Sequence, residues 1–161
     1  MSNNNIKNID KLAKKLALLG GNVEETFKRS INNQCRKIQA EAKLLCPGDT
    51  GDLRESIKKR VQVANGHVEG IVYTNKEYAA YVEFGTGRVG EMTPVADKYP
   101  GALSYKQDKW LTNIPDVGIR WVQGQPAQPY LYPALKNNED RVLENIKQDL
   151  ESEIREVARR W

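Results

Sequence analysis

Apolar residues near the N-terminus recur at steps of three and four positions, which is the spacing of one face of an α-helix. The pattern predicts a short helix that ends at Gly20-Gly21, and a longer helix that Asn22 caps and Pro47-Gly48 ends. The first apolar face contains Ile6, Ile9, Leu12, Leu16 and Leu19, and the second contains Val23, Phe27, Ile31, Ile38, Ala42 and Leu45. We interpret residues 1–21 as an N-terminal helical extension.

The apolar period changes from helical to alternating after the second helix. Val61 and Val63 precede the dipeptide Asn65-Gly66, and a second run rich in β-branched residues, Val68 to Tyr73, follows it. Asn-Gly between two such runs is typical of a tight β-hairpin, because both central residues of its turn need positive φ angles. The sequence therefore predicts two antiparallel strands, over residues 56–64 and 67–75.

The remaining chain predicts a short helical turn, a long irregular stretch and a final helix. The turn covers residues 77–84, and residues 88–124 resemble an inserted loop in which residues 118–122 could form a further strand. The final helix follows Pro129 and carries Leu131, Leu135, Val142, Ile146, Leu150, Ile154 and Val157. These elements predict an α+β fold: a small, mainly antiparallel sheet of about three to five strands, packed by the long N-terminal helix and the C-terminal helix.

Length and composition limit the class of protein. A chain of 161 residues suits one hydrophobic core, so we expect a single domain over residues 1–161. The net charge of +4 is too mild to indicate nucleic-acid binding by itself. The chain has no run of about 18 apolar residues, and its start lacks the apolar segment of a signal peptide. We therefore expect a soluble protein, made in the cytoplasm, with no membrane partner.

The two cysteines, Cys35 and Cys46, lie in one predicted helix. At a rise of about 1.5 Å per residue they are roughly 16 Å apart, which is beyond the Cα separation of about 7 Å that a disulfide tolerates. Neither a histidine nor a second cysteine pair accompanies them at metal-site spacing. We expect core thiols, no metal and no cofactor.

The stretch Gly85-Thr86-Gly87 invites comparison with a phosphate-binding loop, because glycines let backbone N–H groups approach an anion. A P-loop needs Lys and then Ser or Thr after its last glycine, whereas Arg88 and Val89 follow here. The segment also leaves a predicted helix instead of entering one. We therefore predict a structural turn.

Glu83 precedes this turn and is the candidate carboxylate for acid–base catalysis, with Asp49, Asp52 and Glu55 as candidate partners. The only histidine, His67, directly follows the hairpin turn, where we expect it to be exposed. The alternative is structural: an ion pair with Arg54 or Arg88, or hydrogen bonds from loop N–H groups. We favour the structural role, so the sequence predicts no catalytic residue and no enzyme.

Aromatic side chains gather in and just after the long stretch, interleaved with lysines and arginines. They are Tyr99, Tyr105, Trp110, Trp121, Tyr130 and Tyr132. Such residues could stack on single-stranded bases or form a protein–protein contact. We favour the protein contact and predict an interface at Tyr99, Tyr105, Trp110, Trp121, Pro129 and Tyr130. A nucleic-acid-binding module that uses Lys58-Lys59-Arg60 stays open as the alternative.

Three motifs occur in order along the chain: Asp49-Thr50-Gly51-Asp52-Leu53-Arg54-Glu55-Ser56-Ile57, Tyr78-Ala79-Ala80-Tyr81-Val82-Glu83-Phe84-Gly85-Thr86, and Pro126-Ala127-Gln128-Pro129-Tyr130-Leu131-Tyr132-Pro133-Ala134-Leu135. Together with the helix that precedes them, they resemble the head-to-tail joining proteins of tailed bacteriophages, a family of neck, tail-completion and minor tail components. The resemblance covers about residues 25–155. The family usually has Phe where this chain has Tyr130.

The resemblance implies a structural virion protein without a cofactor. Its structural turns would contain Thr50, Gly51, Leu53, Arg54, Glu83, Phe84, Gly85, Thr86 and Gly87, and Glu83 would fix the turn that launches the long loop. The implied assembly is a homo-oligomeric ring, six- or twelve-fold, at the neck or the top of the tail. Its implied partners are the phage connector and the tail tube or tail terminator proteins, and DNA would pass through the lumen without being read.

Overall fold

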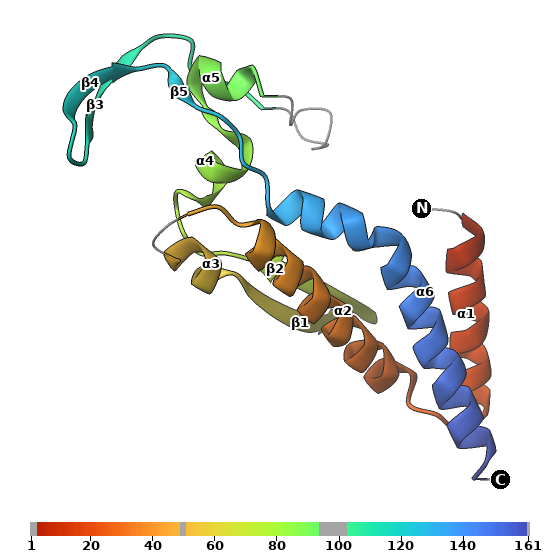
Figure 1. Ribbon diagram of the computed structural model, residues 1–161. Helices are drawn as coiled ribbons and strands as arrows, with labels where there is room; N and C mark the ends of the chain where they lie inside the picture. The colour runs from red at the N-terminus through yellow and green to blue at the C-terminus, as the bar shows by residue number, and fades with distance from the viewer. Residues whose placement is uncertain (1–2, 49–50, 94–102, 161) are drawn as a thin grey trace. The chain divides into compact units, whose positions relative to one another are not determined.

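The computed structural model of the protein describes residues 3–48, 51–93 and 103–160, and its helices and strands are labelled in Figure 1. In chain order they are α1 (Asn3–Leu18), α2 (Val23–Leu45), α3 (Asp52–Ser56), β1 (Lys58–Ala64), β2 (His67–Tyr73), α4 (Ala79–Phe84), α5 (Gly87–Glu91), β3 (Trp110–Ile114), β4 (Gly118–Val122), β5 (Gly124–Gln125) and α6 (Leu131–Ala158). The chain divides into two units, which we describe separately: residues 1–41, 58–73 and 134–161 form unit 1, and residues 42–57 and 74–133 form unit 2.

The core of unit 1 lies between helices. Figure 1 shows α1 beside the C-terminal half of α6. The buried cluster contains Leu16, Ile146, Leu150, Ile154 and Val157, with Ile9, Leu12, Leu19, Val23, Phe27, Ile31 and Val142 packed against it. These are residues that recur at helical spacing in the sequence, so the apolar periodicity predicts which side chains form the core. Burial of each large side chain stabilises the fold by about 1.5–3 kcal/mol.

Polar contacts fix the alignment of α2 with α6. The Ser30 hydroxyl donates to the carboxylate of Asp149, and the amide of Asn145 donates to the side chain of Gln34 at 2.9 Å. Ser30 and Gln34 are both buried, and a buried polar group is costly unless it has such a partner. A shift of one helix along the other would break these bonds, so they specify the register.

The connection between α1 and α2 confirms the predicted helix stop and helix cap. A Cβ atom at Gly21 would lie 2.2 Å from Leu16 Cδ1, so only glycine lets the chain turn this closely over the core leucine. The side chain of Asn22 then accepts a hydrogen bond from the Glu25 N–H at 3.0 Å, as an N-cap residue does.

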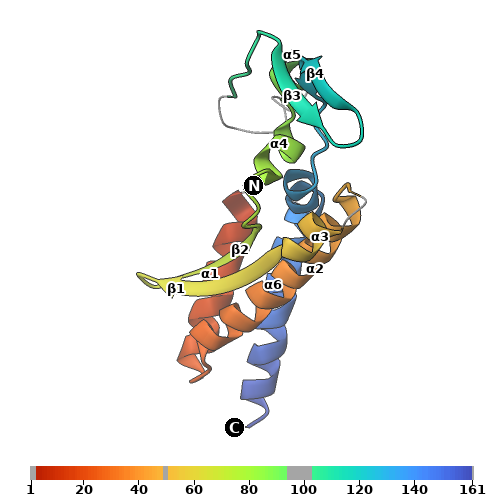
Figure 2. The same ribbon diagram turned by 90° about the vertical axis from the view of Figure 1, so that its left-hand side faces the viewer.

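The hairpin of β1 and β2 is also confirmed, and Figure 2 shows its two long strands. Asn65 and Gly66, with φ angles of 52° and 76°, form the turn between the partners Ala64 and His67. Gly70 brings β2 against α2, because a Cβ atom there would lie 2.4 Å from Cys35 Sγ. The sheet therefore packs on the second helix through a position where the sequence has no side chain.

The α+β class is confirmed, but the sheet differs from the prediction of about three to five strands. The described residues contain two separate antiparallel sheets, β1–β2 and β3–β4. A further difference concerns residues 88–124, which we expected to form an inserted loop. They contain most of α5 and the hairpin of β3 and β4, which includes the predicted strand over residues 118–122. Pro115 and Asp116 form the turn of this hairpin: Asp116 has a φ angle of 63°, and the Val117 N–H donates to the Ile114 carbonyl at 3.1 Å.

Candidate functional site

The centre of unit 2 is a buried carboxylate. Glu83 lies on α4 with only 4% of its surface exposed. Its Oε2 atom accepts hydrogen bonds from the backbone N–H groups of Tyr130 at 2.8 Å and Leu131 at 2.9 Å, and its Oε1 atom accepts one from Tyr132 at 2.9 Å. Glu83 therefore caps the N-terminus of α6 from a distance of more than forty residues along the chain.

This cap accounts for the N–H groups that the start of a helix leaves without partners. An α-helix leaves about four such groups at its N-terminus, normally satisfied by a nearby Ser, Thr, Asp or Asn. The start of α6 has no such residue and no acidic residue in its first turn. Glu83 supplies acceptors for three N–H groups, and the fourth position is Pro133, which has no N–H to satisfy. The negative charge also suits the positive end of the helix dipole.

The geometry decides between the two structural roles expected for Glu83. Among the described residues, no arginine or lysine lies within ion-pair distance of it. Arg54 donates instead to the Cys46 carbonyl at 3.3 Å, so the ion-pair hypothesis is wrong and the hydrogen-bond hypothesis is confirmed. The N–H donors belong to the start of α6, so Glu83 does not fix the turn that launches residues 88–124.

A catalytic role for Glu83 has little geometric support. Asp52 and Glu55 are exposed, and Asp49 lies outside the described residues. Both carboxylate oxygens already accept backbone hydrogen bonds, which leaves Glu83 poorly placed to exchange a proton with a substrate. In the part of the chain that the structure describes, no group of three or more His, Cys, Asp or Glu side chains is placed to hold a metal ion.

The Gly85-Thr86-Gly87 stretch holds a second segment of backbone. Gly85 and Gly87 have φ angles of 73° and 58°, as the turn prediction requires. A Cβ atom at Gly87 would lie 2.3 Å from the carbonyl oxygen of Gln123, and Thr86 accepts a hydrogen bond from the Gln125 N–H at 3.1 Å. The segment does enter a helix, contrary to our expectation, but α5 has only five residues. These glycines therefore serve close packing between chain segments.

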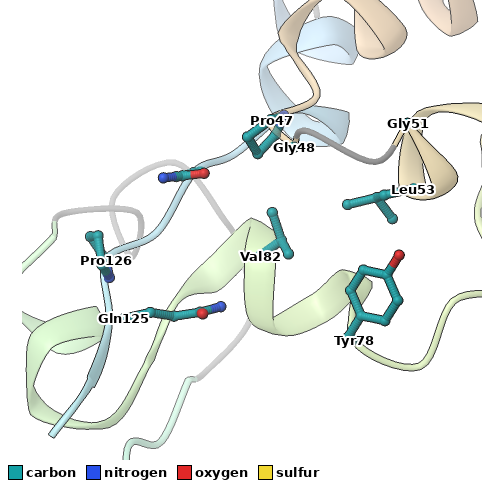
Figure 3. Close-up of a pocket in the computed structure, with 9 residues that line it drawn as sticks. Pro47, Gly48, Gly51, Leu53, Tyr78, Val82, Gln125 and Pro126 are labelled. Atoms are coloured by element: carbon teal, nitrogen blue, oxygen red, sulfur yellow. The ribbon is translucent and has the colours of Figure 1, made fainter. Parts of the chain in front are cut away.

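The turn before α3 places the first motif beside α4. Gly51 has a φ of 76° and Leu53 is buried, whereas Thr50 lies outside the described residues. Leu53 lines a small pocket of about 200 Å³ together with Pro47, Tyr78 and Val82. Figure 3 shows these side chains around the pocket, with Gln125 and Pro126 on its other side. The three sequence motifs therefore meet in unit 2.

The residues predicted for an interface divide between the interior and the surface. Tyr130 is fully buried, so its side chain offers no surface to a neighbour, and Tyr99 lies outside the described residues. Tyr105, Trp110 and Pro129 are partly buried, and the Tyr105 hydroxyl donates to the Phe84 carbonyl at 2.9 Å. Trp121 is exposed. The surface part of the prediction thus centres on the β3–β4 hairpin.

The Tyr130 hydroxyl has no hydrogen-bond partner among the described residues. Burial raises the pKa of this phenol above its ordinary value, and the nearby negative charge of Glu83 raises it further. Since an unpaired buried hydroxyl costs about 1–3 kcal/mol, we expect Tyr130→Phe to stabilise the protein by about 1 kcal/mol in denaturant unfolding. Tyr132→Phe, at a partly buried neighbouring position, is the matched control.

The pH dependence of the Tyr130 variant gives a second readout. Because the pKa of the Tyr130 phenol is raised in the folded protein, the unfolded chain loses this proton first, and the free energy of unfolding falls as the pH rises above the ordinary tyrosine value of about 10. The advantage of Tyr130→Phe should therefore grow in alkaline solution. Equal or lower stability of the Phe variant would show that the hydroxyl has a partner in solution.

One face of the β3–β4 hairpin is apolar and exposed. Leu111 pairs with Trp121, and Ile119 lies two residues before Trp121 on the same strand face. Their exposed fractions are 54%, 65% and 65% for Leu111, Ile119 and Trp121, and we call these three residues the hairpin face. The sequence predicted Trp121 as an interface residue but not Leu111 or Ile119, because residues 110–114 do not alternate between apolar and polar.

The opposite face of the same hairpin borders a hollow of about 730 Å³. Trp110 lines it from β3, and Tyr78, Tyr81, Phe84 and Tyr105 line it from the neighbouring segments. We call these five residues the aromatic groove. Lys106 also lines the hollow and lies over the Trp110 ring at 5.4 Å from the ring centroid.

Comparison with known proteins covers the first motif and nearly all of the second. Residues 10–85 match the model of a family described as "Bacteriophage HK97-gp10, putative tail-component". This match confirms the resemblance to phage head-tail joining and tail proteins, and it supports a structural component of the phage tail that interacts with other head or tail proteins. No curated protein and no solved structure matches the chain significantly. Within the described residues, no helix is long and apolar enough to cross a membrane.

Proposed function

We propose that this structural phage tail protein forms a homo-oligomeric ring, six- or twelve-fold, at the neck or top of the tail, where it completes the tail and joins it to the head. The observation that carries the proposal is the exposed hairpin face. Apolar surface concentrated on a two-stranded hairpin marks an interaction site, because so small a sheet gains little stability alone.

The chemistry of Glu83 supports a structural role over an enzymatic one. The carboxylate that best suited catalysis is buried, and its hydrogen bonds go to the backbone of α6. It therefore joins the second sequence motif to the third within one fold. A subunit that repeats around a ring needs such a fixed geometry, since every error is repeated at each contact.

The partners that we propose are further copies of the chain, the phage connector, and the tail tube or tail terminator proteins. DNA would pass through the lumen without sequence-specific contacts. The basic residues of the chain outnumber the acidic ones in unit 1 but not in unit 2, so unit 1 is the better candidate for facing DNA. The protein would be made in the host cytoplasm and act in the virion.

The nucleic-acid-binding alternative has less support from the cluster on which it rests. Lys59 donates to the side chain of Asn32, and Arg60 lies over the Tyr73 ring at 5.6 Å from its centroid. Only Lys58 of the three basic residues is without such a contact among the described residues. The cluster therefore serves the fold of unit 1 in large part.

The location of the protein in the particle tests the proposal. Gold-labelled antibodies against the chain should bind at the junction of head and tail, with one label site per particle. Particles that lack the chain, prepared by deleting the gene and mixed in the same grid, provide the control. Labelling along the tail shaft or at the distal tip would contradict the position at the neck, although the chain would still be a component of the tail.

A further inference from the structure

Two apolar surfaces lie on opposite faces of one hairpin. Successive residues of a strand point to opposite faces, so Trp110 belongs to the aromatic groove while its neighbour Leu111 belongs to the hairpin face. The pairing of Leu111 with Trp121 places Trp121 on the side of Leu111. The hairpin face therefore points away from the groove of its own chain and cannot fill it.

Both surfaces have the character of a contact site. Tyr81 is 58% exposed beside the hollow, and the other groove residues are aromatic, which suits an apolar guest. The hairpin face offers a tryptophan and two aliphatic side chains. Lys106 lines the groove and Asp116 lies in the turn of the hairpin, so the tip of the hairpin carries a charge opposite to that of the groove.

We propose that the hairpin face of one subunit fills the aromatic groove of a second copy of this chain. This inference rests on the proposed ring and names the surfaces that would join its subunits. The hairpin face and the groove are different surfaces on opposite sides of one element, so subunits that offer one surface to each neighbour join head-to-tail. Repeated head-to-tail contacts close into a ring when the rotation between subunits allows it.

The size of the hairpin face explains why the ring would need several subunits. Three side chains of this kind offer on the order of 400 Å² of apolar surface. A stable pair of proteins usually buries roughly 800 Å² on each partner. A single contact is therefore too small for a stable dimer, whereas each subunit of a closed ring makes two contacts and gains from their simultaneous formation.

The chemistry of the hairpin face favours a second copy over nucleic acid. Leu111, Ile119 and Trp121 carry no charge, and the nearby Arg120 alternates to the opposite face of the strand. A site for single-stranded DNA combines stacking aromatics with cations that neutralise phosphates. The hairpin face has a single aromatic ring and lacks cations, so it suits an apolar protein groove.

Cross-linking between two variants that each carry one added cysteine tests this contact. Ile119→Cys places a thiol on the hairpin face, and Tyr81→Cys places one in the aromatic groove. The native Cys35 and Cys46 are buried, and burial raises the pKa of both thiols, so they react slowly with maleimides. A short bis-maleimide should link the mixed variants at least about tenfold more than it links either variant alone, because multiple ring contacts raise the local concentration.

Two controls make the result specific. A mixture of Leu18→Cys and Tyr81→Cys carries a thiol on α1, at a leucine that is 88% exposed, and should give only background linking. The double variant Ile119→Cys/Tyr81→Cys should give a ladder of linked species that ends at the ring, because each subunit then carries both halves of the contact.

The alternative outcomes separate this inference from the proposed function. If Ile119→Cys alone gives as much cross-linked product as the mixture of the two variants, the hairpin faces meet each other in a two-fold contact. This result would overturn the head-to-tail geometry. If the mixed variants give only background cross-linking, while gold-labelled antibodies place the chain at the neck, the hairpin face binds another virion protein. In that case the proposed function stands and the inference fails. If the antibody label lies away from the neck but the mixed variants link strongly, the contact between copies stands and the proposed position at the neck is wrong.

Discussion

Glu83→Gln should lower the free energy of unfolding by about 3 kcal/mol and the Tm by roughly 10 °C. Glutamine keeps the size of the side chain but removes its charge, and its NH₂ group would face backbone N–H donors. At least one N–H group at the start of α6 would then lose its acceptor in a buried site. Chemical denaturation followed by circular dichroism measures the loss.

The matched control for this prediction is Glu77→Gln. Glu77 is exposed, just before α4, so the same chemical change should alter stability by less than about 0.5 kcal/mol. Assembly by Glu83→Gln should fall only in proportion to the folded fraction. Equal stability of the two variants would show that the cap contributes nothing, and the account of the motifs would then be wrong.

Replacing the hairpin face should block assembly while the subunit stays folded. In the triple variant Leu111→Thr, Ile119→Thr and Trp121→Thr, threonine keeps a high β-propensity but removes most of the apolar surface. Truncation of central apolar residues costs about 2 kcal/mol or more per contact, and a ring repeats the loss at every contact. We expect particle yield in a complementation assay to fall at least about 100-fold.

The control for the triple variant also removes exposed apolar side chains, but at positions outside the hairpin face. Leu18 and Leu44 are the most exposed large apolar residues on α1 and α2 among the described residues. Leu18→Gln with Leu44→Gln should leave particle yield unchanged. If both variants assemble normally, the hairpin face is not an interface; if the triple variant unfolds, its loss of yield reports stability alone.

Local signals predicted the elements that depend on neighbouring residues. Asn65-Gly66 fixes its hairpin through the φ angles of two adjacent residues, and Asn22 caps α2 through a hydrogen bond to the N–H three positions later. The apolar period also predicted the helical core of unit 1. In each case the cause lies within a few residues, so a single sequence displays it.

Contacts between residues that are distant in the sequence were not predicted. The N–H donors to Glu83 lie more than forty residues away along the chain. The sequence therefore suggested hydrogen bonds from N–H groups to Glu83, but it did not show that these groups belong to the start of α6. Tyr130 resembled a surface aromatic beside a proline, but its burial depends on tertiary packing. Within residues 88–124, the strand over residues 118–122 was predicted, but its partner β3 was not, because residues 110–114 do not alternate between apolar and polar.

Negative-stain electron microscopy of particles made after deletion of the gene tests the central claim most directly. The account predicts filled heads separate from tails, or tails of uncontrolled length, and recovery of whole particles when the intact chain is supplied in trans. Normal, infectious particles without the chain would contradict a joining or completing role at the neck.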